Sequence, residues 1–120
     1  MRQSFIALII LLLSPGAGTA GSMQLLVTHD VACGDFSRWQ HEIGPSYATS
    51  SAGRVAPLRE IQTDGPWPDG LALASRPRQT PTFILVEDGI EIGRIEGYGD
   101  AASFHADLAR LLRYGGNGAR

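Results

Sequence analysis

The sequence has no lysine and only one cysteine among its 120 residues. Without lysine, the protein cannot form a Schiff base through a side chain or use a lysine as a general base. Its permanent positive charges are all arginines, which stay protonated at any working pH. With one cysteine, Cys33, it cannot form an internal disulfide. This thiol is therefore a small core residue, a free reactive group or a partner in an intermolecular bond.

Net charge is also low, at a formal value of −2, and only three histidines are present, His29, His41 and His105. A chain with no basic excess is not expected to bind nucleic acid. The histidines and Cys33 do not have the close spacing of metal ligands, so we expect neither a metal site nor a cofactor.

Residues 1–20 have the pattern of a secretory signal peptide. Arg2 precedes an unbroken apolar run from Phe5 to Leu13, and small residues follow as far as Ala20. This run is too short to cross about 30 Å of hydrocarbon as a mature helix, which disfavours a retained anchor. We therefore expect a protein that is periplasmic or secreted and that has no contact with the membrane after cleavage.

The remaining residues are enough for one compact domain and leave no room for a second. We assign residues 21–114 to this domain and residues 115–120 to a flexible tail.

The first half of the domain predicts a strand and a divided helix. Gln24 to Thr28 reads as a buried strand. From Cys33 to about Ser50, apolar residues recur at helical spacing, and Pro45 should divide that helix after Ile43 or Gly44. We expect a second strand in the latter half of the segment from Arg54 to Gln62.

The second half predicts a short helix, a hairpin and a final helix. Pro68 to Ala74 fits a short helix, because proline is tolerated in a first turn. Thr82 to Glu87 and Ile90 to Glu96 flank Asp88-Gly89, the pattern of a β-hairpin. An amphipathic helix follows Asp100. The predicted fold class is α/β, with a mixed four-stranded sheet and helices on both faces.

The chain resembles the thioredoxins. The run from Cys33 to Phe36, Cys-Gly-Asp-Phe, lies where thioredoxins have Cys-Gly-Pro-Cys after the first buried strand. Thr80-Pro81-Thr82 resembles the cis-proline segment of the family, and Gly97 resembles the glycine that closes its hairpin. The resemblance covers Leu25 to Leu112 and implies a thioredoxin-like fold.

A narrower resemblance is to the periplasmic thioredoxin-like proteins of bacterial sulfur-oxidation (Sox) gene clusters. It is carried by Trp39 and the runs Glu42–Pro45, Pro57–Arg59, Thr80–Phe83 and Gly93–Tyr98. That family usually has Cys-x-x-Cys, whereas this chain has Phe36 as the second member.

The resemblance implies that Cys33 is the catalytic nucleophile. Its position at a helix N-terminus stabilises a thiolate, whereas the negative charge of Asp35 opposes one. Phe36 replaces the resolving thiol. Val27 stands where thioredoxins have a buried carboxylate, six residues before the nucleophile.

The expected substrate-binding residues are Gly34, Phe36, Trp67, Thr80 and Pro81. A cis bond before Pro81 would let the Thr80 backbone pair with an extended peptide or with glutathione; a trans proline at the start of a strand is the alternative. Trp67 either lines this groove or packs under its own loop.

Three weaker candidates are Arg76 and Arg78, as an anion pocket, and His29, as a partner of the thiolate. Solvated loop arginines and an unpartnered histidine at a strand end are the ordinary alternatives for these positions.

Two functions follow from these observations. In one, the protein exchanges thiols and disulfides through Cys33 alone, and an external thiol resolves the adduct. In the other, it is a non-catalytic binding module that keeps the peptide groove. We expect a monomer that acts on a thiol- or disulfide-bearing protein or on glutathione.

Overall fold

The structure is a computed structural model that describes residues 22–30 and 32–115. The predicted signal peptide lies outside these residues. The elements of the described part are, in order, β1 (Met23–His29), α1 (Gly34–Glu42), α2 (Gly44–Tyr47), α3 (Ser51–Val55), β2 (Leu58–Gln62), β3 (Thr82–Glu87), β4 (Ile90–Glu96) and α4 (Ala101–Tyr114). No helix of the described part is long and apolar enough to cross a membrane.

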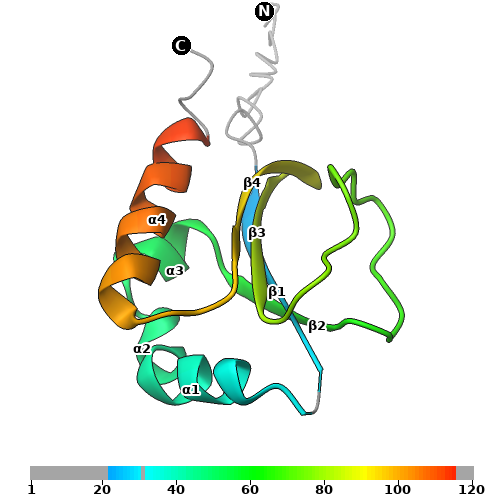
Figure 1. The fold of residues 1–120 in the computed structure, drawn as a ribbon. Coiled ribbons are helices and arrows are strands. Elements are labelled where there is room, and N and C mark those ends of the chain that lie inside the picture. Colours follow the sequence, from blue (N-terminus) through cyan, green and yellow to red (C-terminus); the bar gives the residue numbers. More distant parts are fainter. Residues whose placement is uncertain (1–21, 31, 116–120) are drawn as a thin grey trace, which may run out of the picture.

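The four strands form one mixed sheet in the order β2-β1-β3-β4 (Figure 1). β1 pairs in parallel with β2 and antiparallel with β3, so it is central. Leu25, Leu26 and Val27 are fully buried, as expected for a strand that is covered on both faces. The predicted α/β class, sheet composition and hairpin are confirmed.

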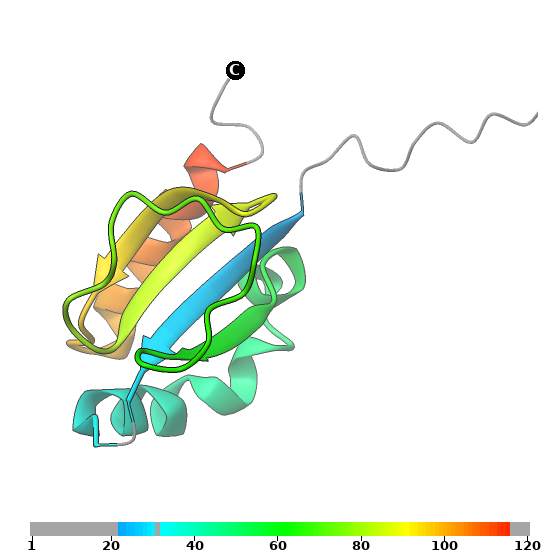
Figure 2. The same cartoon turned by 90° about the vertical axis from the view of Figure 1, so that its right-hand side faces the viewer.

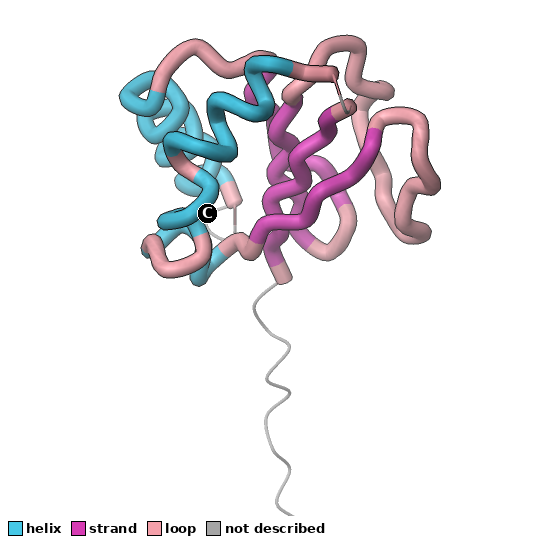
Figure 3. Tube along the Cα trace, turned by 90° about the horizontal axis from the view of Figure 1, so that it is seen from below, coloured by secondary structure: helices cyan, strands magenta, loops and turns pink. Residues whose placement is uncertain are grey.

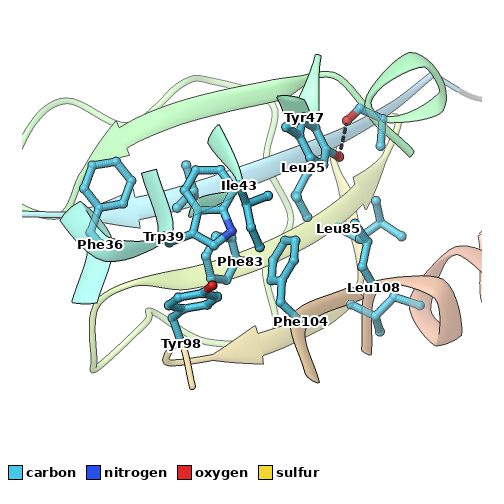
Figure 4. Packing of buried hydrophobic residues seen from close by; sticks show 13 residues of the cluster. Leu25, Phe36, Trp39, Ile43, Tyr47, Phe83, Leu85, Tyr98, Phe104 and Leu108 are labelled. Carbon is cyan, nitrogen blue, oxygen red and sulfur yellow. Dashed lines mark hydrogen bonds between the residues drawn. The ribbon is translucent and has the colours of Figure 1, made fainter. Parts of the chain in front are cut away.

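Within residues 22–30 and 32–115, helices cover only one face of this sheet (Figures 1 and 3). α1 ends at Glu42, and Pro45 lies in the first turn of α2, so the predicted division of this helix is confirmed. The side chains on this face form one apolar cluster with Trp39 and Phe83 at its centre, 5.1 Å apart between ring centroids (Figure 4). The short helix α3 before β2 was not predicted.

The second face is covered by the loop of residues 63–81, which corrects the expectation of helices on both faces (Figure 2). Three of its apolar side chains, Trp67, Leu71 and Leu73, pack on the cluster formed by Leu26, Ile61, Ile84 and Val86. Apolar area on this face is therefore covered without a helix.

The predicted helix from Pro68 to Ala74 is wrong. Gly70 has a φ of 85°, which interrupts a right-handed helix. The Ala72 N–H donates to the Gly89 carbonyl at 2.7 Å, and the Ala72 carbonyl accepts from the Glu91 N–H at 3.0 Å. The backbone of this loop therefore pairs with the hairpin, which periodicity within the segment cannot indicate.

The last helix begins as predicted, since the Asp100 carboxylate accepts a 2.8 Å hydrogen bond from the Ser103 N–H. This bond lowers the pKa of Asp100. Gly115, which follows this helix, is buried, and a Cβ there would lie 2.9 Å from the sulfur of Met23. Residues 116–120 lie outside the described part.

Candidate active site

Cys33 is the N-cap of α1. Its backbone is extended, with φ −80° and ψ 106°, and its Sγ accepts a hydrogen bond of 3.4 Å from the Phe36 N–H. The cysteine is free and partly exposed, and it packs against the helix-side cluster. A partly exposed sulfur at a helix N-terminus is a suitable position for a nucleophile.

Phe36 lies one helical turn after Cys33, and only 6% of it is exposed. Its ring stacks on His29 with 4.2 Å between centroids and 8° between planes, and it lies 6.1 Å from Trp39. Figure 4 shows it at the edge of the core. An aromatic ring therefore fills the position that a second thiol would need.

Val27 is fully buried in the same cluster and pairs with Phe83 across the sheet. Its environment is apolar, so no titratable group stands at this position to relay a proton beneath Cys33.

The cis-proline segment lies at the same edge of the sheet. The Thr80–Pro81 peptide bond is cis, and the Pro81 carbonyl accepts a 2.7 Å hydrogen bond from the Gly97 N–H. Because β1 and β3 are antiparallel and Thr28 is opposite Thr82, the end of β1 that leads to Cys33 meets the start of β3. The fold thus brings the thiol and the proline loop to one edge.

A search of solved structures found thioredoxins that are similar to this chain. The periplasmic thioredoxin SoxS from Paracoccus pantotrophus, in its reduced form, is 40% identical, with a TM-score of 0.73 over 75% of this chain and 95% of that one. The chain belongs to the thioredoxin superfamily.

A thioredoxin from Malassezia sympodialis shares the fold, with 17% identity and a TM-score of 0.51 over 77% of this chain and 76% of that one. A scan against protein-family models and a search of curated proteins found no match.

Trp67 is placed differently from the other expected binding residues of this thioredoxin-like protein. It packs on the face of the sheet opposite α1, its indole N–H donates to the Thr63 carbonyl at 3.2 Å, and the Arg76 guanidinium lies 5.3 Å from its ring centroid. A surface pocket of about 280 Å³ adjoins Trp67 and Arg76. This placement agrees with the alternative of a residue packed under its own loop.

Of the weaker candidates, His29 has partners other than the thiol, namely the Phe36 ring and a Glu60 carboxylate oxygen at 3.5 Å from its Nε2. Arg76 is engaged with Trp67, and Arg78 is exposed. Within the part of the chain that the structure describes, no hydrogen bond, ion pair or ring contact joins either arginine to Cys33. No group of three or more histidine, cysteine or acidic side chains in the described residues could hold a metal ion.

The residue that sequence reasoning missed is Arg38. Its guanidinium donates to the Asp35 carboxylate at 3.1 Å, the Tyr98 carbonyl at 2.9 Å and the Gly99 carbonyl at 2.7 Å. The i, i+3 spacing of Asp35 and Arg38 could have indicated the first contact. The other two join residues about 60 positions apart, which no local pattern reveals.

The Tyr98 hydroxyl adds a second link to the same helix by donating to the Glu42 carboxylate. Burial, followed by this hydrogen bond, raises the pKa of Tyr98 to about 12. Arg38 and Tyr98 together fix α1 to the segment between β4 and α4.

Proposed function

We propose that this protein is an exported thioredoxin-like protein that carries out thiol–disulfide exchange with Cys33 as its only thiol. The observation that carries the proposal is the sulfur of Cys33 at the N-cap of α1, partly exposed, with Phe36 buried where a second thiol would stand. Such a site can begin exchange, but it cannot complete it alone.

The chemistry takes two displacements. The Cys33 thiolate attacks one sulfur of a substrate disulfide, forms a mixed disulfide and releases the other substrate sulfur as a thiolate. An external thiolate, from glutathione or a protein, then attacks the mixed disulfide and forms a new disulfide with the substrate, and the Cys33 thiolate leaves. Two electrons and one proton pass from the external thiol to the released thiol, and the protein is unchanged.

The proposed substrate groove consists of Gly34, Phe36, Thr80 and Pro81. Gly34 is exposed, and a Cβ there would have nothing within 4 Å, so a substrate can approach the sulfur over it. The Thr80 backbone precedes β3 and is suited to pair with an extended peptide or glutathione. We leave Trp67 out of this groove because it packs on the opposite face.

The proposed location is the periplasm or the exterior. The similar protein SoxS is a periplasmic thioredoxin, and residues 1–20 have signal-peptide character. We expect the mature domain to begin near Gly21 and to act as a monomer. Mass spectrometry of the exported protein should find an N-terminus near Gly21; a mature form that still carries Met1 would contradict this assignment.

The exchange proposal is tested with a glutathionylated peptide. The wild type should remove glutathione from the peptide at a rate that rises with the concentration of external thiol, and Cys33→Ser should show only the uncatalysed rate. The buried Phe36 and Val27 also suit a binding module. Equal peptide affinity for wild type and Cys33→Ser, with no catalysed exchange by either, would select that function instead.

A further inference from the structure

Arg38 joins the first turn of the Cys33 helix to a segment about 60 residues away. It lies on α1, and its guanidinium carbon is 4.7 Å from the centroid of the Tyr98 ring. Two hydrogen bonds to the carbonyls of Tyr98 and Gly99 fix the same group from the side of β4 and α4. The guanidinium is thus held in one place, where it donates to the Asp35 carboxylate at 3.1 Å and lies 4.0 Å from a Glu42 carboxylate oxygen.

Asp35 needs this partner because of where it stands. It is the second residue of α1, two positions after Cys33, in the turn whose Phe36 N–H binds the sulfur. A carboxylate in the same helical turn repels a thiolate, and this repulsion opposes the stabilisation by the helix N-terminus. The Arg38 guanidinium lies 3.1 Å from the Asp35 carboxylate and so places a compensating positive charge beside it.

The stability of the fold does not explain this pair. The Arg38 and Asp35 side chains are 40% and 58% exposed, and ion pairs at such positions contribute little to folding. Asp35 is two residues from Cys33, and Arg38 is held by two backbone carbonyls; neither is true of another pair with the same spacing, Arg110 and Asp107 on α4, which are also 3.1 Å apart.

We propose that Arg38 is a positioning residue that keeps Cys33 reactive by holding and neutralising the Asp35 carboxylate. The inference rests on the proposed role of Cys33 as a nucleophile.

The other ionisable groups on the elements around Cys33 are not substituted in the variants below, and Arg38→Gln also removes the 4.0 Å contact with Glu42 on the same helix. Asp30 binds the Ala32 N–H at 3.0 Å in the loop before Cys33. His29 on β1 faces Glu60 on β2, and Arg78 is exposed in the loop before the cis proline.

The test is the rate at which iodoacetamide alkylates Cys33 in the folded protein, measured from pH 5 to pH 10. The thiolate displaces iodide and forms one S–C bond, so the rate follows the thiolate population. Arg38→Gln should slow alkylation at neutral pH by roughly three- to tenfold and move the midpoint of the pH profile upward. Asp35→Asn should have the opposite effect, and the double variant should return to within about twofold of the wild type.

Arg110→Gln is the matched control, because it removes the same charge from an equivalent pair far along the sequence. Its alkylation rate and midpoint should equal those of the wild type. Added salt should shrink the effect of Arg38→Gln, since the pair is exposed. Circular dichroism of each variant checks that it is folded. If Arg38→Gln does not fold, the alkylation rate of Asp35→Asn still tests the inference.

The results separate the two proposals. If wild-type Cys33 is alkylated and forms mixed disulfides, but Arg38→Gln behaves like Arg110→Gln, or Asp35→Asn does not change the profile, this inference is overturned and the exchange function stands. If wild-type Cys33 reacts neither with iodoacetamide nor with a disulfide, the exchange function itself fails.

Discussion

Replacing Phe36 with cysteine should convert the protein into one with two active-site thiols. Phe36 is three residues after Cys33 at the start of α1, and its N–H already binds the Cys33 sulfur. Side chains with this spacing are about 5–6 Å apart at Cβ, and disulfides span Cα distances of about 4.4–6.8 Å. A thiol at position 36 is therefore within reach of a mixed disulfide at Cys33.

The substitution has a cost in stability that follows from burial. Phe36 is 6% exposed and stacks on His29 and Trp39, so most of its ring contacts are lost. We expect the reduced variant to be destabilised by about 2–4 kcal/mol, somewhat less than truncation of a buried phenylalanine to alanine costs, because the cysteine side chain fills part of the space. For a domain of this size, that corresponds to a fall in melting temperature of roughly 10–25 °C.

The assay is the reduction of insulin by dithiothreitol, with Phe36→Ala as the control that opens a similar cavity but adds no thiol. Wild type and Phe36→Ala depend on dithiothreitol to resolve each adduct and should accelerate it little, whereas Phe36→Cys should accelerate it clearly. Its rate should remain below that of an ordinary thioredoxin, because Val27 supplies no buried carboxylate. The reasoning is refuted if folded Phe36→Cys forms no internal disulfide, or if it reduces insulin no faster than the wild type.

Two further predictions concern the fold around the site. Gly53→Ala should destabilise the domain by several kcal/mol (roughly 3 or more), since its Cβ would lie 1.9 Å from the Tyr47 carbonyl oxygen. Gly99→Ala should not destabilise it, because a Cβ there would have nothing within 4 Å. Thermal unfolding of both variants checks this, and equal melting temperatures would contradict it. The hydrogen bond from Arg94 lowers the pKa of Glu91, so Glu91 contributes stability above the unfolded value of about 4.3 and loses that contribution as the pH falls through its lower folded value. Chemical unfolding from pH 6 to pH 3 should therefore show a steeper loss of stability for the wild type than for Glu91→Gln, and parallel curves would refute the assignment.

Local patterns predicted most of the helix-side architecture. The spacing of Phe36, Trp39, Ile43 and Tyr47 gave the apolar stripe of the first helices, and all four are buried. Asp88-Gly89 predicted the hairpin because this turn needs positive φ at both residues, and the structure has 53° and 83° there.

The loop of residues 63–81 could not be predicted in the same way. Its structure depends on partners outside the segment: Ala72 pairs with the hairpin, and Trp67 packs on the cluster that includes Ile61 and Ile84. The role of Arg38 was missed for the same reason, since Tyr98 and Gly99 come close to it only in the folded chain. Resemblance to thioredoxins did supply Cys33 and Pro81, because these lie in short motifs.

The central claim, that Cys33 reacts with disulfides and has no internal thiol to release the adduct, is tested most directly by intact mass. The folded protein is incubated with glutathione disulfide at neutral pH and freed of excess reagent, and its mass is followed with time. We predict one glutathione adduct on the wild type and none on Cys33→Ser, and the adduct should persist until an external thiol is added. A wild-type protein that forms no adduct, or an adduct that disappears without added thiol, would contradict the account.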